Sequence, residues 1–235
     1  MKKRIWIVSA LVCVLLVTTI LLLNQAAKNK RLFQAVWDSD VQAVSDAIRD
    51  GANVNAYHRL FTLFADDNVS RTPLLFACYS GENAEEMAHL LLLAGADPNK
   101  ATPYLKETPL HIAARMGLYS TAYELIECGA DINAIDDTES VLSATLVWLT
   151  EQERTGPDSE AHRFFCILIE RGATLNCPLD RTILHYAVLY GDQFAVEYLL
   201  KNTQVDRNKK DFDGKTALDY AVEMNEEEIV KMLQS

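Results

Sequence analysis

The stretch that decides the fold lies at residues 108–114, Thr-Pro-Leu-His-Ile-Ala-Ala, and it recurs along the chain. Thr followed by Pro predicts a helix start, because the Thr hydroxyl caps free backbone amides and Pro occupies the first helical position, where no N–H donor is needed. Related stretches begin at Thr72, Thr182 and Thr216. The four threonines are 36, 74 and 34 residues apart, so the double interval predicts one degenerate copy between residues 140 and 178.

A second motif follows at a regular offset and supplies a turn. It has the form Gly-Ala-Asp-x-Asn, with Asn or Thr replacing Asp in two copies, and its copies begin at Gly51, Gly95, Gly129 and Gly172. Apolar segments with helical periodicity, such as 88–93 and 194–200, predict longer second helices. Glycines, which tolerate positive φ, stand where the first short helix of a unit must end. They are Gly81, Gly117 and Gly191. The sequence therefore predicts repeated helix–turn–helix units.

Two motifs in register, several times over, resemble the ankyrin repeat, and the resemblance covers residues 31–235. It implies an all-α solenoid of about six helix–turn–helix units, in which the first and last units act as caps. A single unit cannot cover its own apolar face, so its stability comes from stacking on its neighbours. The expected units are 31–70, 71–105, 106–138, 139–178, 179–213 and 214–235.

The first 24 residues predict a separate signal-anchor, a transmembrane helix. No charge occurs in the nineteen residues from Ile5 to Leu23, a run of ~28 Å as a helix, close to the thickness of a bilayer core. The alternative is a cleaved secretory signal, but the run exceeds the usual apolar region and residues 24–27, Asn-Gln-Ala-Ala, make a poor cleavage site. A short basic linker is expected at 25–30.

The start Met-Lys-Lys-Arg resembles bacterial signal-anchors, which implies an inner-membrane protein with its repeats in the periplasm. Charges on the two sides of the apolar run nearly balance, so the positive-inside rule leaves the orientation open. They are Lys2, Lys3 and Arg4 on one side and Lys28, Lys30 and Arg31 on the other.

Charge restricts the class of partner. The chain has a net charge of −11, and no acidic residue precedes Asp38, so residues 32–235 carry 16 basic against 33 acidic residues, a net charge of −17. Such a surface repels phosphate backbones and anionic lipid heads, which argues against nucleic acid. A neutral or basic protein partner fits better.

The ankyrin resemblance also implies a binding surface. In that family, the two positions before the turn glycine point into the concave groove. The types favoured at protein interfaces, Trp, Tyr and Arg, occur repeatedly in this row. Carried over by position, the row includes Trp37, Tyr79, Arg115, Met116, Trp148 and Tyr190. The alternative for the two tryptophans is that they fill the core, because both lie in weakly matching units.

Two insertions depart from the family length. The segment between Asn55 and Arg71 is long and apolar, and it either packs over the first repeat or contacts a partner or the bilayer. Its candidate contact residues are Tyr57, Phe61 and Phe64. The acidic insertion at 151–160 is expected to be a solvated loop.

No pattern in the sequence indicates catalysis, a cofactor or a metal. His111 and His185 belong to the repeat motif itself, in which the family's histidine bonds locally to stabilise the turn. His-Glu-x-x-His, Gly-x-Ser-x-Gly, a phosphate-binding loop and a calcium loop are all missing. We therefore expect a non-enzyme without cofactor or metal.

The predicted anchor, the acidic repeats and the predicted groove together indicate a membrane-tethered module that binds a protein in the periplasm. The combination resembles the small anchored ankyrin proteins that bacteria encode beside antibacterial toxins, which implies an immunity protein that neutralises an effector. The alternatives are an envelope scaffold that supports a periplasmic or inner-membrane enzyme, or a cytoplasm-facing scaffold if the topology is reversed.

Overall fold

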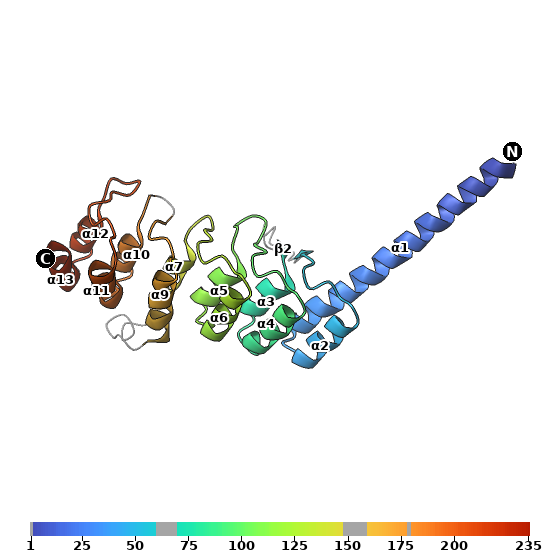
Figure 1. Ribbon diagram of the computed structural model, residues 1–235, viewed down its shortest axis with the longest axis horizontal. Coiled ribbons are helices and arrows are strands. Elements are labelled where there is room, and N and C mark those ends of the chain that lie inside the picture. The colour runs from blue at the N-terminus through green and yellow to red at the C-terminus, as the bar shows by residue number, and fades with distance from the viewer. Residues whose placement is uncertain (1, 60–69, 148–158, 178–179) are drawn as a thin grey trace. The chain divides into compact units, whose positions relative to one another are not determined.

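The computed structural model describes residues 2–59, 70–147, 159–177 and 180–235. Short helices follow one another in pairs and divide into two compact bodies, the N-terminal body Met1–Ala96 and the C-terminal body Asp97–Ser235 (Figure 1). The N-terminal body contains α1 (Lys2–Trp37), α2 (Val41–Arg49), β1 (His58–Arg59), β2 (Ser70–Arg71), α3 (Pro73–Tyr79) and α4 (Ala84–Leu93). The C-terminal body contains α5 (Pro109–Arg115), α6 (Tyr119–Glu127), α7 (Val141–Ala144), α9 (Glu160–Glu170), α10 (Ile183–Leu189), α11 (Gln193–Asn202), α12 (Ala217–Glu223) and α13 (Glu227–Gln234).

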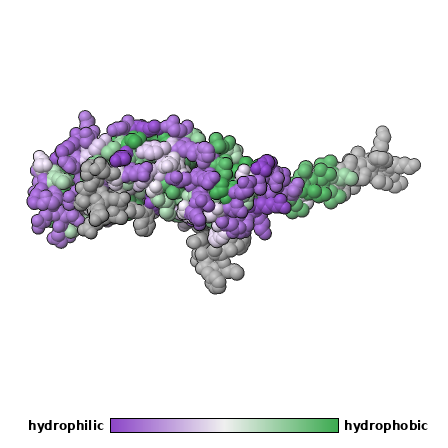
Figure 2. All heavy atoms as spheres, turned by 90° about the horizontal axis from the view of Figure 1, so that it is seen from below, coloured by the Kyte–Doolittle hydropathy of each residue, from purple (hydrophilic) through white to green (hydrophobic). Residues whose placement is uncertain are grey.

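The helix α1 has 36 residues and consists of an exposed apolar segment followed by turns that pack in the first repeat. Its last turns are the first helix of the first repeat, because Leu32 and Val36 are fully buried there. Further back, the side chains from Val14 to Leu23 stand in solvent, and Figure 2 shows them as an apolar segment that projects from the packed part of this body. Among the described side chains, no helix is both long enough and apolar enough to cross a membrane.

The segment 25–30, expected as a linker, is helical and lies inside α1. It is held against the first repeat, because Gln25 Nε2 donates to the Gly51 carbonyl oxygen (3.1 Å) and Asn29 Oδ1 accepts from the Asn53 backbone N–H (2.8 Å). One helix therefore leads from the apolar segment directly into the repeat. The predicted boundaries of the repeat units stay predictions.

The predicted helix starts are confirmed, and most of them share a reciprocal cap. At α5, Thr108 Oγ1 accepts from the His111 backbone N–H, and His111 Nδ1 accepts in return from the Thr108 backbone N–H (3.3 Å). The pair Thr182 and His185 does the same at α10. Burial lowers the pKa of both histidines, which favours the neutral ring whose Nδ1 can accept a hydrogen bond.

The degenerate repeat predicted between residues 140 and 178 contains α7 and α9. It begins with a cap of the same kind, because the hydroxyls of Ser140 and Ser143 accept each other's backbone N–H at 3.2 and 2.9 Å. Ser140 stands where the other copies have Thr, and Ser143 stands where the copies at Thr108 and Thr182 have His. The all-helical prediction is confirmed with one addition, the antiparallel pair β1 and β2 in the first insertion.

The asparagines that end three copies of the Gly-Ala-Asp-x-Asn motif, Asn55, Asn99 and Asn133, bond to the next repeat. In the C-terminal body, Asn99 Nδ2 donates to the Gly129 carbonyl oxygen (2.8 Å), and Asn99 Oδ1 accepts from the Asp131 backbone N–H (2.8 Å). Asn133 Oδ1 accepts in the same way from the Thr174 N–H (2.8 Å). The motif is thus both a turn and a link between neighbouring repeats.

Candidate protein-binding surface

The predicted groove residues of the N-terminal body lie where α1 ends and on α3. Trp37 is 57% exposed, and its ring stacks on Phe76 with centroids 5.3 Å apart. Tyr79 follows Phe76 by three positions on the same helix, so the two side chains lie on one face. The Arg71 guanidinium lies over the Tyr79 ring, 4.2 Å from its centroid. We call Trp37, Phe76, Tyr79 and Arg71 the aromatic patch.

The aromatic patch is suited to contact a protein, because it presents rigid rings that need little further ordering on binding. Trp37 does not fill the core as the alternative predicted, since more than half of its surface is exposed. Phe76 and Arg71 were not identified from the sequence. The spacing of Phe76 one helical turn before Tyr79 is the signal that could have indicated it.

In the C-terminal body, the predicted groove residues differ in how much surface they present. Met116 is 46% exposed, and Tyr190 is half-buried with its ring 6.2 Å from that of Tyr186. Arg115 is mostly covered, with a side chain 22% exposed. Trp148 lies outside the described residues. Among the predicted positions of this body that the structure describes, Met116 is therefore the most exposed.

Arg115 is already paired within the fold. Its guanidinium contacts the buried carboxylate of Glu107, and its Nη1 lies 3.4 Å from Glu139 Oε1. Burial is the main cause that raises the pKa of Glu139 to about 7; Arg115 opposes this shift, and the nearby Asp136 adds to it. The arginine thus ties the end of α5 to the loops on either side of it, and part of its charge is neutralised there.

The predicted contact residues of the first insertion are only partly described. Tyr57, just before β1, is 44% exposed. Phe61 and Phe64 lie outside the described residues. The hairpin register pairs His58 with Arg71, which carries the start of the insertion to the backbone beside the aromatic patch.

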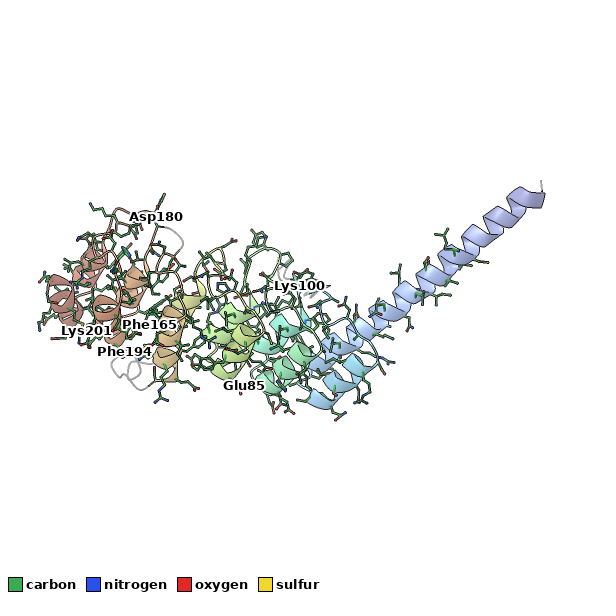
Figure 3. All side chains as sticks on the ribbon, in the orientation of Figure 1. Glu85, Lys100, Phe165, Asp180, Phe194 and Lys201 are labelled. Atoms are coloured by element: carbon green, nitrogen blue, oxygen red, sulfur yellow. The ribbon has the colours of Figure 1, made fainter. Side chains whose placement is uncertain are left out.

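A buried histidine–aspartate pair joins α9 to α11. His162 Nε2 lies 2.9 Å from Asp192 Oδ2, and both side chains are fully buried. Asp192 Oδ1 also caps α11 through the Ala195 backbone N–H (2.9 Å), and the His162 ring stacks on Phe194 with centroids 4.3 Å apart. Figure 3 labels Phe194 on α11 and Phe165 on α9 in this packed region. The pair fixes two helices and has no access to a substrate.

The described residues contain no group of three or more His, Cys, Asp or Glu side chains placed to hold a metal ion.

Comparison with known proteins identifies the repeats. A family model described as "Ankyrin repeats (3 copies)" matches residues 23–136 and 159–235. Human mitochondrial disaggregase is 31% identical over 217 residues, which are 88% of this chain and 26% of that protein. The transient receptor potential channel pyrexia of Drosophila melanogaster is 38% identical over 180 residues, which are 72% of this chain and 17% of that protein. The chain thus spans about a quarter or less of these relatives.

The fold is also that of a solved ankyrin domain. The crystal structure of the ankyrin repeat domain of Bcl-3 superimposes with a TM-score of 0.65 at 22% sequence identity. The match covers 87% of this chain and 84% of that one. The predicted helical-repeat solenoid fold is therefore confirmed.

Proposed function

Because the chain belongs to the ankyrin-repeat family, whose repeats are protein-binding modules, we propose that it binds its partner protein while held at a bacterial inner membrane, with the repeats in the periplasm. We propose further that the partner is an antibacterial toxin, which binding neutralises. The observation that carries the tethering is the apolar half of α1. Its residues Val14 to Val17 and Ile20 to Leu23 are each 55–71% exposed, around the helix and not along one stripe.

Such a segment is costly in water and favourable in lipid. Its backbone hydrogen bonds are satisfied within the helix, and its sequence continues an uncharged run that starts at Ile5. The orientation rests on the resemblance of the start Met-Lys-Lys-Arg to bacterial signal-anchors, because the basic residues on the two sides of the run nearly balance.

The partner's class follows from the exposed surface. The aromatic patch offers Trp and Tyr rings with an Arg, the residue types that dominate protein interfaces. The net charge of −17 over residues 32–235 favours fast capture of a basic or neutral protein and disfavours nucleic acid. Ankyrin domains are typically non-catalytic, and a toxin can be neutralised by binding alone.

Membrane attachment is tested by fractionating cells that express the full chain. Replacing Leu16 and Leu22 by Asp should move the chain from the membrane fraction to the soluble fraction, because charge in the hydrocarbon layer is costly. The matched control is Leu93→Asp on α4, whose side chain is 72% exposed, as Leu22 is at 71%, and which should stay in the membrane fraction. A soluble parent chain would contradict the tethering.

Orientation and immunity need two further measurements. A reporter active only in the periplasm, fused after Ser235, should be active, and a cytoplasmic reporter at the same place should be silent. Deleting the gene should make cells sensitive to attack by sibling cells. If the cytoplasmic reporter alone is active, or if sensitivity does not change, the immunity function is wrong, while the protein-binding module stands.

A further inference from the structure

Val222 on α12 is exposed at a position that the preceding repeats bury. It is 56% exposed, whereas Ala114 on α5 and Val188 on α10, which likewise follow the starting Thr of their helix by six residues, are 2% and 0% exposed. A further repeat follows α5 and α10, but α12 and α13 stand at the end of the C-terminal body (Figure 1). The position is therefore one that a following repeat covers.

Two more apolar residues of the last repeat are uncovered in the same way. Leu218 on α12 and Val230 on α13 are half-buried, whereas Leu184 and Val196, 34 residues earlier, are fully buried. We call Leu218, Val222 and Val230 the end face. The outer face of a terminal repeat is usually polar, because this keeps the array soluble. The end face departs from this rule, which indicates that another molecule covers it.

The first repeat, by contrast, has polar residues on its outer face. Arg31 and Gln34 of α1 are exposed, and they stand at the positions of Ile183 and Tyr186, which are buried in α10. A copy of this chain thus presents a cation and an amide at its first repeat, where stacking on the end face needs apolar side chains. Head-to-tail stacking of copies is therefore disfavoured.

The charges beside the end face on α12 are mixed in sign. Hydrogen bonds from the Thr216 backbone N–H and hydroxyl lower the pKa of Asp219, and the nearby Lys210 and Lys215 lower it further, so this carboxylate is ionised at neutral pH. Lys215 Nζ also donates to Glu223 Oε2 (2.7 Å). Lysines and carboxylates thus lie side by side around α12.

The charges on α13 are also of both signs, with an excess of acid. Lys231 Nζ donates to Glu228 Oε1 (2.7 Å), while Glu226 and Glu227 form no ion pair within the described part of the chain. The surroundings of the end face therefore select neither a strongly basic nor a strongly acidic occupant.

We propose that the end face binds the end face of a second copy of this chain, which gives a two-fold symmetric dimer through α12 and α13. Inside the chain, helix pairs cover these positions, and a second copy supplies a helix pair whose uncovered residues are equally apolar. In a two-fold interface each pair of residues occurs twice, so Lys210 and Lys215 of one copy can face Asp219 of the other without a surplus of either sign. Such a contact closes on itself and forms no fibre. This inference does not rest on the membrane or immunity proposals.

The first test is the molar mass of the full-length chain in mild detergent, measured by light scattering with the detergent contribution subtracted. The parent should have twice the mass of one chain. Val222→Asp should raise the dissociation constant of the dimer about tenfold or more, because it places a charge in an apolar contact. The matched control, Leu93→Asp on α4, changes a residue that is 72% exposed and lies outside the end face, so it should dimerise as the parent does. Circular dichroism should show the helix content of the parent in both variants.

A second control separates this dimer from association through the apolar segment of α1. Replacing Leu16 and Leu22 by Asp should leave the dimer intact, because neither residue belongs to the end face. A photo-crosslinking amino acid at Val222 should give, in cells, an adduct of twice the chain mass, and the same amino acid at Leu93 should give none.

Four results would overturn the proposal. The first is a parent with the mass of one chain at every concentration. The second is an equal dissociation constant for Val222→Asp and the parent. The third is loss of the dimer when Leu16 and Leu22 are replaced by Asp, which would assign the association to α1. The fourth is an adduct at Val222 that contains a different protein, which would assign the end face to another partner.

Discussion

Glu139 is a carboxylate that the fold keeps away from water at a cost. Its side chain is 8% exposed, its Oε1 accepts no hydrogen bond among the described residues, and the Nη1 of Arg115 lies 3.4 Å away. Burial raises its pKa to about 7, against 4.5 for the ordinary carboxyl. The folded state therefore takes up a proton that the unfolded state releases. The stability that this proton contributes is complete below pH 4.5 and is lost as the pH rises to about 7.

Glu139→Gln should remove this loss. The amide cannot ionise, and Arg115 keeps its contact with Glu107. We expect the free energy of unfolding to exceed that of the parent by about 1–3 kcal/mol above pH 7, and to match it near pH 4.5, because one pKa unit corresponds to about 1.4 kcal/mol. Urea unfolding followed by circular dichroism across this pH range measures the difference.

The control for this prediction is Glu127→Gln. Glu127 lies 3.0 Å from Arg171 Nη1, but its side chain is 70% exposed, so its ion pair contributes little. Equal stabilisation of both variants, or a Glu139→Gln effect that does not depend on pH, would contradict the prediction. Either result would show that ionisation of Glu139 does not cause the loss of stability between pH 4.5 and about 7.

At the scale of elements, α1 joins an exposed apolar half to a buried half without a break. Leu32 is fully buried and Leu22 is 71% exposed, although they are the same residue type on the same helix. The difference arises because α2 and α3 pack on α1, whose buried side chains, among those described, lie between Leu32 and Val36. A partner bound at Trp37 would therefore be held by the same rigid helix that we propose enters the membrane.

Substitution of Leu32 and of Leu22 distinguishes the part of α1 that stabilises the fold from the part that does not. Leu32→Ala should lower the free energy of unfolding of the N-terminal body by about 2–5 kcal/mol, the usual cost of a cavity in a core. Leu22→Ala should leave it unchanged within about 0.5 kcal/mol. Urea unfolding of the full chain in mild detergent gives both values. Equal destabilisation by the two changes would mean that the apolar half of α1 packs on the fold.

Sequence reasoning succeeded for features that a few consecutive residues determine. Thr-Pro starts, turn glycines and the Asn of each turn act locally, so the helix pairs were predictable. The start of α7 was not, because Ser140 and Ser143 form the same cap without the Thr-Pro signal. The burial of Arg115 could not be predicted either, because the carboxylates that it contacts, those of Glu107 and Glu139, come from two different loops. The continuity of α1 through residues 25–30 depends likewise on contacts with the later residues Gly51 and Asn53.

At the scale of the whole molecule, the repeats supply rigid surface and the charge selects what approaches it. Stacked repeats place exposed side chains at the ends of first helices, as at Trp37 and Met116, and on loop tips, as at Phe212. The excess of acidic residues keeps anionic partners away from most of this surface. Binding to a basic protein should accordingly weaken as salt concentration rises.

The central claim is that the ends of the first helices bind the partner. The most direct test places a photo-crosslinking amino acid, in separate full-length variants in living cells, at Trp37, Met116 or Tyr190. The controls place it at Glu85 on α4, labelled in Figure 3, and at Glu197 on α11, both exposed on second helices. We predict that illumination yields one covalent adduct of constant partner mass from the first three positions and none from the controls. Adducts from Glu85 and Glu197 alone, or equal adducts from all five positions, would contradict the account.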